Sequence, residues 1–283
     1  MDMTAPEVFD DRICVLGEGP LWHPLRGQFF WFDILRKRLM SRIGEETLEW
    51  QFDEHVSAAG WVDENRLLVA SETSLSTFDL NTGESEWVIG LEVDNTVTRS
   101  NDGRADPFGG FWIGTMGKSA EKGAGSIYRF YKGELRKLYG DISVSNAICF
   151  APDGTCAYFT DTHSRQVMRQ PLGPDGWPES DPVVFIDLRE EGLNPDGAVV
   201  DSKGCIWVAL WGAGQIARYD PQGRSLSAID YPASQMTCPS FGGPDLTTLY
   251  ATSAAVHLDE TQGGQTFVLQ TDVTGQREHQ VIL

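Results

Sequence analysis

Basic residues are scarce in this sequence. Its 283 residues include 22 Lys and Arg against 41 Asp and Glu, which gives a formal net charge of −19 and an isoelectric point near 4.5. The few basic residues form no cluster, and a surface of this sign repels phosphate backbones and anionic lipids. We therefore expect neither nucleic acid nor a membrane surface among the partners of this chain.

Long apolar runs and an export signal are also missing. No stretch approaches the roughly 20 apolar residues that are needed to cross a bilayer. The N-terminal stretch 1–7 is acidic, whereas a signal peptide has a basic and an apolar region. These absences predict a cytoplasmic protein.

Cysteines are few and scattered. There are five, an odd number, and none belongs to a CxxC pair, so neither a disulfide framework nor a zinc knuckle is indicated. Buried thiols within strands are the simplest interpretation. The sequence also lacks the GxSxG elbow of serine hydrolases and the HExxH motif of zinc proteases.

The sequence contains instead a repeat with a spacing of roughly 40 to 50 residues, the period of four-stranded propeller blades. Turns rich in Asp, Pro and Gly each precede a short apolar run, and these runs cover residues 29–32, 67–70, 111–114, 157–160, 206–209 and 249–252. Alternating strands follow, as at 126–130, 215–219 and 266–269, and no window keeps a helical period.

This repeat predicts an all-β fold, a six-bladed β-propeller with four antiparallel strands per blade, in a single domain over residues 1–283. A β-sandwich or two small β domains are the alternatives, and the even spacing argues against both. A propeller must close its ring. We expect the N-terminal run 12–16 and the C-terminal run 280–283 to serve the last blade.

Aligning the repeats on their turns places an oxygen-bearing side chain at the start of every innermost strand, one residue further back in the first blade than in the others. These side chains are Glu18, Ser57, Asn101, Asn146, Asp196 and Thr237. Equivalent positions lie at one depth around a propeller axis, so the two carboxylates and two amides would converge and form a hard oxygen set for one divalent metal on the central axis. The alternative is that these residues cap strands or bind channel water, because Asn and Asp beside glycine favour turns.

Several segments resemble motifs of the gluconolactonase/regucalcin (SMP-30) family. They are Gly17-Glu18-Gly19-Pro20-Leu21-Trp22, Arg99-Ser100-Asn101-Asp102-Gly103, Gly114-Thr115-Met116, Asn194-Pro195-Asp196-Gly197, and the stretches 207–212 and 238–243. They cover nearly the whole chain in the order of the family. The resemblance implies a six-bladed propeller that hydrolyses aldonolactones with one divalent metal.

The resemblance also implies a ligand set for the metal. Glu18, Asn146 and Asp196 match the three protein ligands, and Asp196 also matches the proposed catalytic acid/base. Because the set contains no His or Cys, Ca²⁺ suits it best, with Zn²⁺, Mg²⁺, Mn²⁺ and Fe²⁺ as alternatives. We expect the metal to polarise the lactone carbonyl and activate water while Asp196 moves the proton.

Three further residues match contacts to the substrate. Arg99 and Asn101 correspond to residues that hold substrate hydroxyls beside the metal, and Glu121 corresponds to an additional acidic contact. His163 stands at a strand end from which it could project over the channel mouth, although an exposed loop residue is the simpler interpretation. Asp161 is expected to hold a loop by hydrogen bonds.

Two other functions stay open at this point. One is a metal-dependent esterase or organophosphatase on the same propeller, and the other is a non-enzymatic, regucalcin-like Ca²⁺-binding protein. Arg99 favours the lactonase, because a polyhydroxylated substrate needs fixed donors beside the metal. The expected partner is therefore a small-molecule sugar lactone, bound by a monomer or a weak homo-oligomer.

Overall fold

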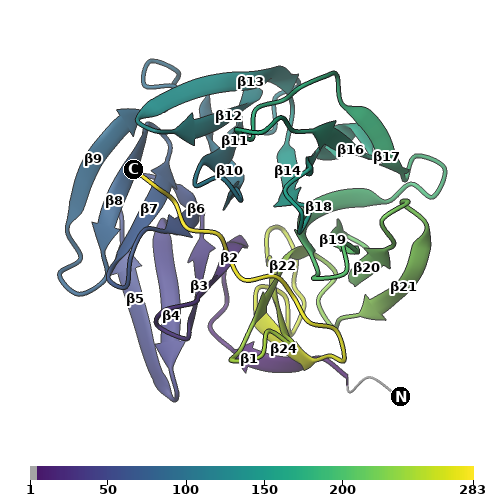
Figure 1. The fold of residues 1–283 in the computed structure, drawn as a ribbon. Helices are drawn as coiled ribbons and strands as arrows, with labels where there is room; N and C mark the ends of the chain where they lie inside the picture. The colour runs from purple at the N-terminus through teal and green to yellow at the C-terminus, as the bar shows by residue number, and fades with distance from the viewer. Residues whose placement is uncertain (1–4) are drawn as a thin grey trace.

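The computed structural model describes residues 5–283, which form six four-stranded sheets arranged in a ring (Figure 1). This six-bladed β-propeller confirms the fold expected from the repeat. The only helical element of the described part is the single 3-10 turn η1 (Thr162–Ser164), and nowhere in residues 5–283 is there a helix that could cross a membrane. Residues 1–4 of the stretch inspected for an export signal lie outside the described part.

Every blade is antiparallel, with its first strand innermost in blades 1 to 5. Blade 1 contains β2 (Gly17–His23), β3 (Gln28–Asp33), β4 (Arg38–Ile43) and β5 (Glu46–Gln51). Blade 2 contains β6 (Val56–Trp61), β7 (Arg66–Ser71), β8 (Ser74–Asp79) and β9 (Ser85–Gly90). Blade 3 contains β10 (Thr98–Ala105), β11 (Phe111–Gly117), β12 (Gly125–Tyr131) and β13 (Glu134–Ile142).

The remaining blades keep this plan except at the ring closure. Blade 4 contains β14 (Ser145–Phe150), β15 (Cys156–Asp161), β16 (Gln166–Pro171) and β17 (Val183–Asp187). Blade 5 contains β18 (Asn194–Val200), β19 (Ile206–Trp211), β20 (Gln215–Tyr219) and β21 (Ser225–Asp230). Blade 6 contains β22 (Met236–Gly242), β23 (Thr248–Ser253), β24 (Thr266–Gln270) and the N-terminal β1 (Glu7–Asp10).

The second strand of each blade is a continuous apolar run because neighbouring blades cover both of its faces. β3, β7, β11, β15, β19 and β23 contain the six runs that the repeat identified. Their side chains join six hydrophobic clusters, one at each interface between adjacent blades. The core is therefore a ring of interfaces, which leaves the inner edges of the blades free for polar residues.

The ring closes differently from the expectation. The closing strand is β1, which pairs with β24, whereas of the run 12–16 only Leu16 forms an isolated bridge, to Ala254. Phe9 fixes β1 by edge contacts with the rings of Phe29 and Tyr250, at centroid distances of 5.7 and 5.0 Å. The contacts of Phe9 thus make β1 the closing strand, and β1 lies a few residues before the apolar run 12–16.

The C-terminal run 280–283 is not a strand of the last blade either. The segment after β24 crosses the middle of the ring (Figure 1) and bonds to the ends of inner strands in several blades. Gln276 donates to the carbonyls of Phe150 (3.0 Å) and Val200 (2.9 Å), and the amide of Val281 donates to the carbonyl of Trp61 (2.9 Å). This segment covers one end of the central channel.

A buried ion pair between Arg104 of β10 and Glu278 fixes this segment. We expect Glu278→Gln to lower the free energy of unfolding by about 3–5 kcal/mol, since it leaves a buried guanidinium unpaired. Urea unfolding measures the loss. Glu134→Gln is the matched control, because Glu134 and Arg136 form an exposed pair that solvent screens, so its loss should change stability little. Equal losses in the two variants would contradict the role given to the C-terminal segment.

Candidate active site

Every innermost strand carries a β-bulge at the register of the polar side chains. The pairing shifts occur between Glu18/Leu21, Val56/Ala58, Ser100/Gly103, Asn146/Cys149, Pro195/Ala198 and Met236/Pro239. Bulges redirect the side chains beside them. In blade 1 the bulge needs Gly19, whose φ is +53° and whose Cβ would lie 2.1 Å from the carbonyl oxygen of Ser57.

Four of the six aligned side chains line one cavity of about 720 Å³ at the channel end opposite the C-terminal segment. They are Glu18, Asn101, Asn146 and Asp196, each at most 5% exposed. The other two join neighbouring blades instead. Ser57 Oγ donates to Ser100 Oγ (2.8 Å), and Thr237 Oγ1 donates to the carbonyl of Gly17 (2.6 Å).

A chain of hydrogen bonds runs along the floor of this cavity. Arg99 Nη1 donates to Asn101 Oδ1 (2.8 Å), and Asn101 Nδ2 donates to Asn146 Oδ1 (3.1 Å). Asn146 Nδ2 donates to Thr162 Oγ1 (2.9 Å), which in turn donates to the carbonyl of Pro195 (2.8 Å) beside the next ring position. The chain fixes both amides. Asn101 turns its oxygen to the guanidinium, and Thr162 fixes the orientation of Asn146.

Burial dominates the electrostatics of the floor. Desolvation, with a smaller effect of the nearby Asp102 carboxylate, raises the pKa of Glu18 to about 8. Desolvation followed by the charge of Glu18 raises the pKa of Asp196 well above its ordinary value. Burial also lowers the pKa of Arg99 to about 10, which leaves this guanidinium charged at neutral pH. The positive charge of Arg99 is therefore too small to compensate both neighbouring carboxylates.

These residues fit a divalent cation. Among residues 5–283 no group of three or more His, Cys, Asp or Glu gathers, so a site here has to combine Glu18 and Asp196 with the amide oxygen of Asn146. Such an all-oxygen set suits hard cations, and a doubly charged ion would offset the two buried carboxylates. The observation that carries the fit is the cost of holding both carboxylates buried, which the charge of Arg99 offsets only in part.

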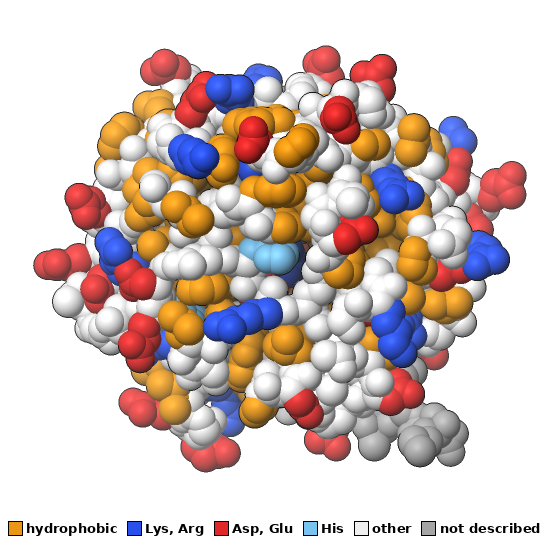
Figure 2. Space-filling model, viewed as in Figure 1, with side chains coloured by type: hydrophobic (Ala, Val, Ile, Leu, Met, Phe, Trp, Pro, Cys, Tyr) orange, Lys and Arg blue, Asp and Glu red, His pale blue; other side chains and the backbone are white. Residues whose placement is uncertain are grey.

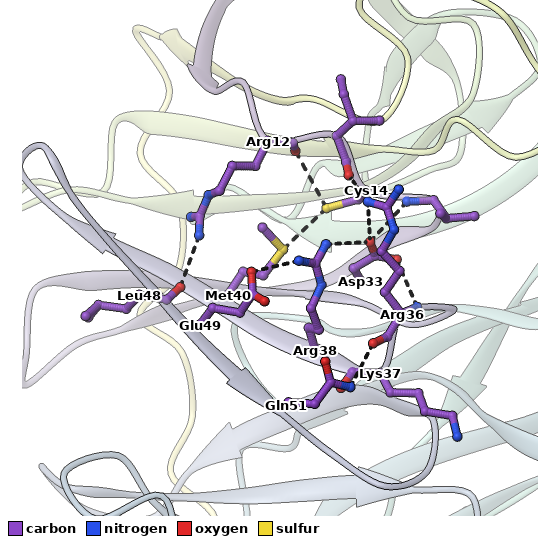
Figure 3. A network of polar contacts seen from close by, with 12 residues as sticks. Arg12, Cys14, Asp33, Arg36, Lys37, Arg38, Met40, Leu48, Glu49 and Gln51 are labelled. Atoms are coloured by element: carbon purple, nitrogen blue, oxygen red, sulfur yellow. Dashed lines mark hydrogen bonds and ion pairs between the residues drawn. The ribbon is translucent and has the colours of Figure 1, made fainter.

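Two aspartates, Asp33 and Asp161, hold the backbone that leads into the ring positions. In blade 1, Asp33 accepts hydrogen bonds from the amides of Val15 (3.1 Å) and Leu16 (3.2 Å), within a network that includes Arg36 and Arg38 (Figure 3). Leu16 lines the cavity two residues before Glu18.

Asp161 does the same in blade 4, where it accepts from the amides of Ser143 (2.9 Å) and Val144 (3.1 Å). This confirms the loop-holding role expected for Asp161. Val144 lines the cavity two residues before Asn146, which is the position of Leu16 relative to Glu18. The two aspartates thus set equivalent wall positions in blades 1 and 4.

The structure does not bring Glu121 into the cavity. Its exposed carboxylate turns back on its own loop and accepts a hydrogen bond from the amide of Ser119 (3.0 Å). The preceding residues of this loop, Lys118, Ser119 and Ala120, line the cavity instead. The motif comparison located the correct loop, but the direction of its side chains depends on a turn that the motif does not describe.

Sequence reasoning also missed most of the cavity wall. An apolar band is formed by Leu16, Leu35, Met116, Val144, Trp211 and Val256. Polar wall residues are Lys118, Thr162, His163, Asn194 and His257. His163 does reach the cavity, as its strand-end position suggested. The others stand in loops, in η1 or near the ends of strands, where no periodic pattern predicts which side chains point inward.

Comparisons with known proteins agree with this geometry. Residues 16–255 match the family model described as the SMP-30/gluconolactonase/LRE-like region. The calcium-binding protein regucalcin of Agrobacterium tumefaciens superposes with a TM-score of 0.95 at 40% sequence identity, covering 99% of this chain and 98% of that one.

Curated relatives include enzymes named for lactone substrates. The 6-deoxy-6-sulfogluconolactonase of Pseudomonas putida is 33% identical over 85% of this chain and 84% of its own length. The pentonolactonase XacC of Haloferax volcanii is 32% identical over 98% of this chain and 97% of its own. With the family model matching most of its length and both relatives aligned over more than four fifths of each chain, the chain belongs to the SMP-30/gluconolactonase family.

Proposed function

We propose that this protein is a divalent-metal-dependent hydrolase that converts an aldonolactone into the aldonic acid. The observation that carries the proposal is the cavity floor, where two buried carboxylates, an oriented amide oxygen and an unpaired guanidinium meet. Relatives named as lactonases support the reaction class.

Glu18, Asn146 and Asp196 would hold the ion. A divalent cation bound there supplies Lewis acidity for the lactone carbonyl and lowers the pKa of water. Ca²⁺ is our first choice, supported by the oxygen ligands and by the calcium-binding description of the Agrobacterium regucalcin. Zn²⁺, Mg²⁺, Mn²⁺ and Fe²⁺ are the ions to compare with it.

Asp196 is proposed as the acid/base. Its carboxylate accepts a proton from the attacking water as the oxygen of that water bonds to the carbonyl carbon. The bond between this carbon and the ring oxygen then breaks, and Asp196 returns the proton to that oxygen, which becomes a hydroxyl of the open-chain acid. Burial suits this role, because it brings the pKa of Asp196 upward from the acidic range.

Arg99 and Asn101 are proposed to bind the substrate hydroxyls. Both hydrogen bonds of the Arg99 side chain to protein leave from Nη1, to Asn101 Oδ1 and to the carbonyl of Ser100, and the guanidinium has no ion-pair partner in the described part of the chain. The N–H groups of Nε and Nη2 are therefore available to a ligand in the cavity.

We expect Arg99→Ala to raise KM by about 10- to 100-fold with a smaller change in kcat, because the directed donors act mainly in binding. Steady-state proton release over a range of lactone concentrations separates the two constants. A variant with unchanged KM and a strongly reduced kcat would contradict this role and place Arg99 in the chemical step.

The proposed function is tested with a panel of 1,4- and 1,5-aldonolactones, together with phenyl acetate and a phosphotriester. Phenyl acetate and the phosphotriester belong in the panel because the apolar wall band could also take an ester without hydroxyls. We expect metal-replete protein to hydrolyse at least one aldonolactone far faster than either. Preference for phenyl acetate or the phosphotriester would favour the esterase alternative, and spontaneous rates throughout would leave a Ca²⁺-binding protein.

A further inference from the structure

The wall of the cavity differs in charge from the chain as a whole. Acidic residues outnumber basic ones, 41 to 22, and carboxylates are spread around the face shown in Figure 2. In the cavity, however, the acidic residues are confined to Glu18 and Asp196 on the floor. The titratable wall residues are Lys118, His163 and His257. A bound divalent ion offsets the two floor carboxylates, so the rest of the cavity favours negative charge in a ligand.

Lys118 is fixed in position on this wall. It follows β11, and its ammonium pairs with Glu72 at the end of β7 and donates to the carbonyl of Thr96 (3.3 Å). Glu72 is itself anchored, because its Oε1 accepts from the amide of His55 (3.1 Å) and lies 2.5 Å from His55 Nδ1. The backbone amide of Lys118 donates to the carbonyl of Val97 (2.9 Å).

This arrangement leaves one donor of Lys118 unused. An ammonium has three N–H groups, of which two point to Glu72 and Thr96. The side chain is 36% exposed and lines the cavity that contains the metal site. A cavity of about 720 Å³ also leaves space beyond one sugar ring, since sites of roughly 300–1,000 Å³ hold drug-sized ligands.

We propose that Lys118 forms a subsite for an anionic group on the substrate, so that the preferred substrates are aldonolactones with a carboxylate, sulfonate or phosphate at the end away from the lactone carbonyl. The inference rests on the proposed lactonase function. Glu72 acts as a positioning residue, because it pairs with the ammonium of Lys118 and fixes its place beside the cavity wall.

The test compares D-glucono-1,5-lactone with three analogues that carry a carboxylate, a sulfonate or a phosphate at carbon 6. The readout is the ratio of kcat/KM for each anionic lactone to kcat/KM for the neutral one. We expect a ratio above one in the native protein, falling at least about tenfold in Lys118→Gln, because a charge-assisted hydrogen bond is lost. The best of the three analogues identifies the anion.

Two variants make the test specific. Lys118→Arg keeps the charge and should retain most of the ratio. Lys122→Gln removes the same charge from the same loop, but Lys122 is exposed and outside the cavity lining, so the ratio should not change. Added salt should lower the ratio in the native protein, because screening weakens the contact.

A ratio near one in the native protein would overturn the subsite, and so would equal ratios in the native protein and Lys118→Gln. In either case, turnover of the neutral lactone would still support the proposed function. If the ratio fell equally in Lys118→Gln and Lys122→Gln, the effect would come from the overall charge of the protein. That result would overturn the subsite as well. Failure to hydrolyse any lactone, neutral or charged, would overturn the proposed function and this inference together.

Discussion

Asp196→Asn is expected to lower kcat for lactone hydrolysis by about a thousandfold or more. The change keeps the shape of the side chain but removes the proton acceptor, and general acid–base catalysis by one group contributes about 10²- to 10⁴-fold. It also removes one of the two carboxylates of the proposed metal site, so affinity for the ion should fall too. Proton release at saturating lactone and metal measures the loss.

The matched control is Ser57→Ala. Ser57 occupies the same register in blade 2, but its hydroxyl bonds to Ser100 and does not line the cavity. We expect nearly native turnover in this variant. Native turnover in Asp196→Asn at saturating metal would contradict the assigned acid/base, whatever the result for Ser57→Ala.

The second large effect concerns stability without metal. The folded-state pKa of Glu18 is raised from about 4.5 to about 8, so the folded protein holds a proton that the unfolded chain releases. The stabilisation is fully present below pH 4.5 and is lost as the pH rises to about 8. At 1.36 kcal/mol for each pKa unit, the loss is about 5 kcal/mol, and Asp196 shifts stability in the same direction.

Urea unfolding of chelator-treated protein between pH 6.5 and 8 measures the upper part of this loss, about 2 kcal/mol at 1.36 kcal/mol for each pH unit. Below pH 6.5 the buried His23 and the half-buried His279, whose pKa values are lowered by desolvation, act in the opposite direction. We expect Glu18→Gln to be more stable than the native sequence at pH 8 without metal. A saturating divalent ion should abolish the pH-dependent loss in the native protein. Metal-free stability that stays level or rises across this window, with no gain in Glu18→Gln, would refute the account.

The fold was largely predictable because each blade repeats the same local code. An Asp-, Pro- or Gly-containing turn followed by an apolar run reports a second strand that is covered on both faces, and all six such runs lie in second strands. The ring positions were predictable for the same reason, since a constant distance to the turn keeps a constant depth in the channel. Four of them do line one cavity.

Ring closure was not predictable from such a code. The run 280–283 is mostly apolar, as a closing strand could be, yet its position is set by contacts with blades that are far away in sequence. Arg104 and Glu278 are 174 residues apart. A short segment of this kind takes its conformation from the surface that it covers, which local pattern cannot supply.

The contacts of the loop after β11 were equally hidden. The motif comparison favoured Glu121, but this carboxylate folds back onto the turn at Gly117, where an added Cβ would lie 2.0 Å from its oxygen. The side chain that lines the cavity is Lys118, held by Glu72 from another blade. The orientation of Lys118 depends on an ion pair with a residue that is distant in sequence, so no local sequence pattern predicts it.

The central claim is tested most directly by removing and restoring the metal. The protein is treated with a chelator, titrated with Ca²⁺ and each alternative ion, and assayed by proton release against its best lactone while bound metal is counted. The account predicts no turnover without metal, full recovery at one ion per chain, and no recovery in Asp196→Asn. Full lactonase activity in protein shown to contain no metal would contradict it.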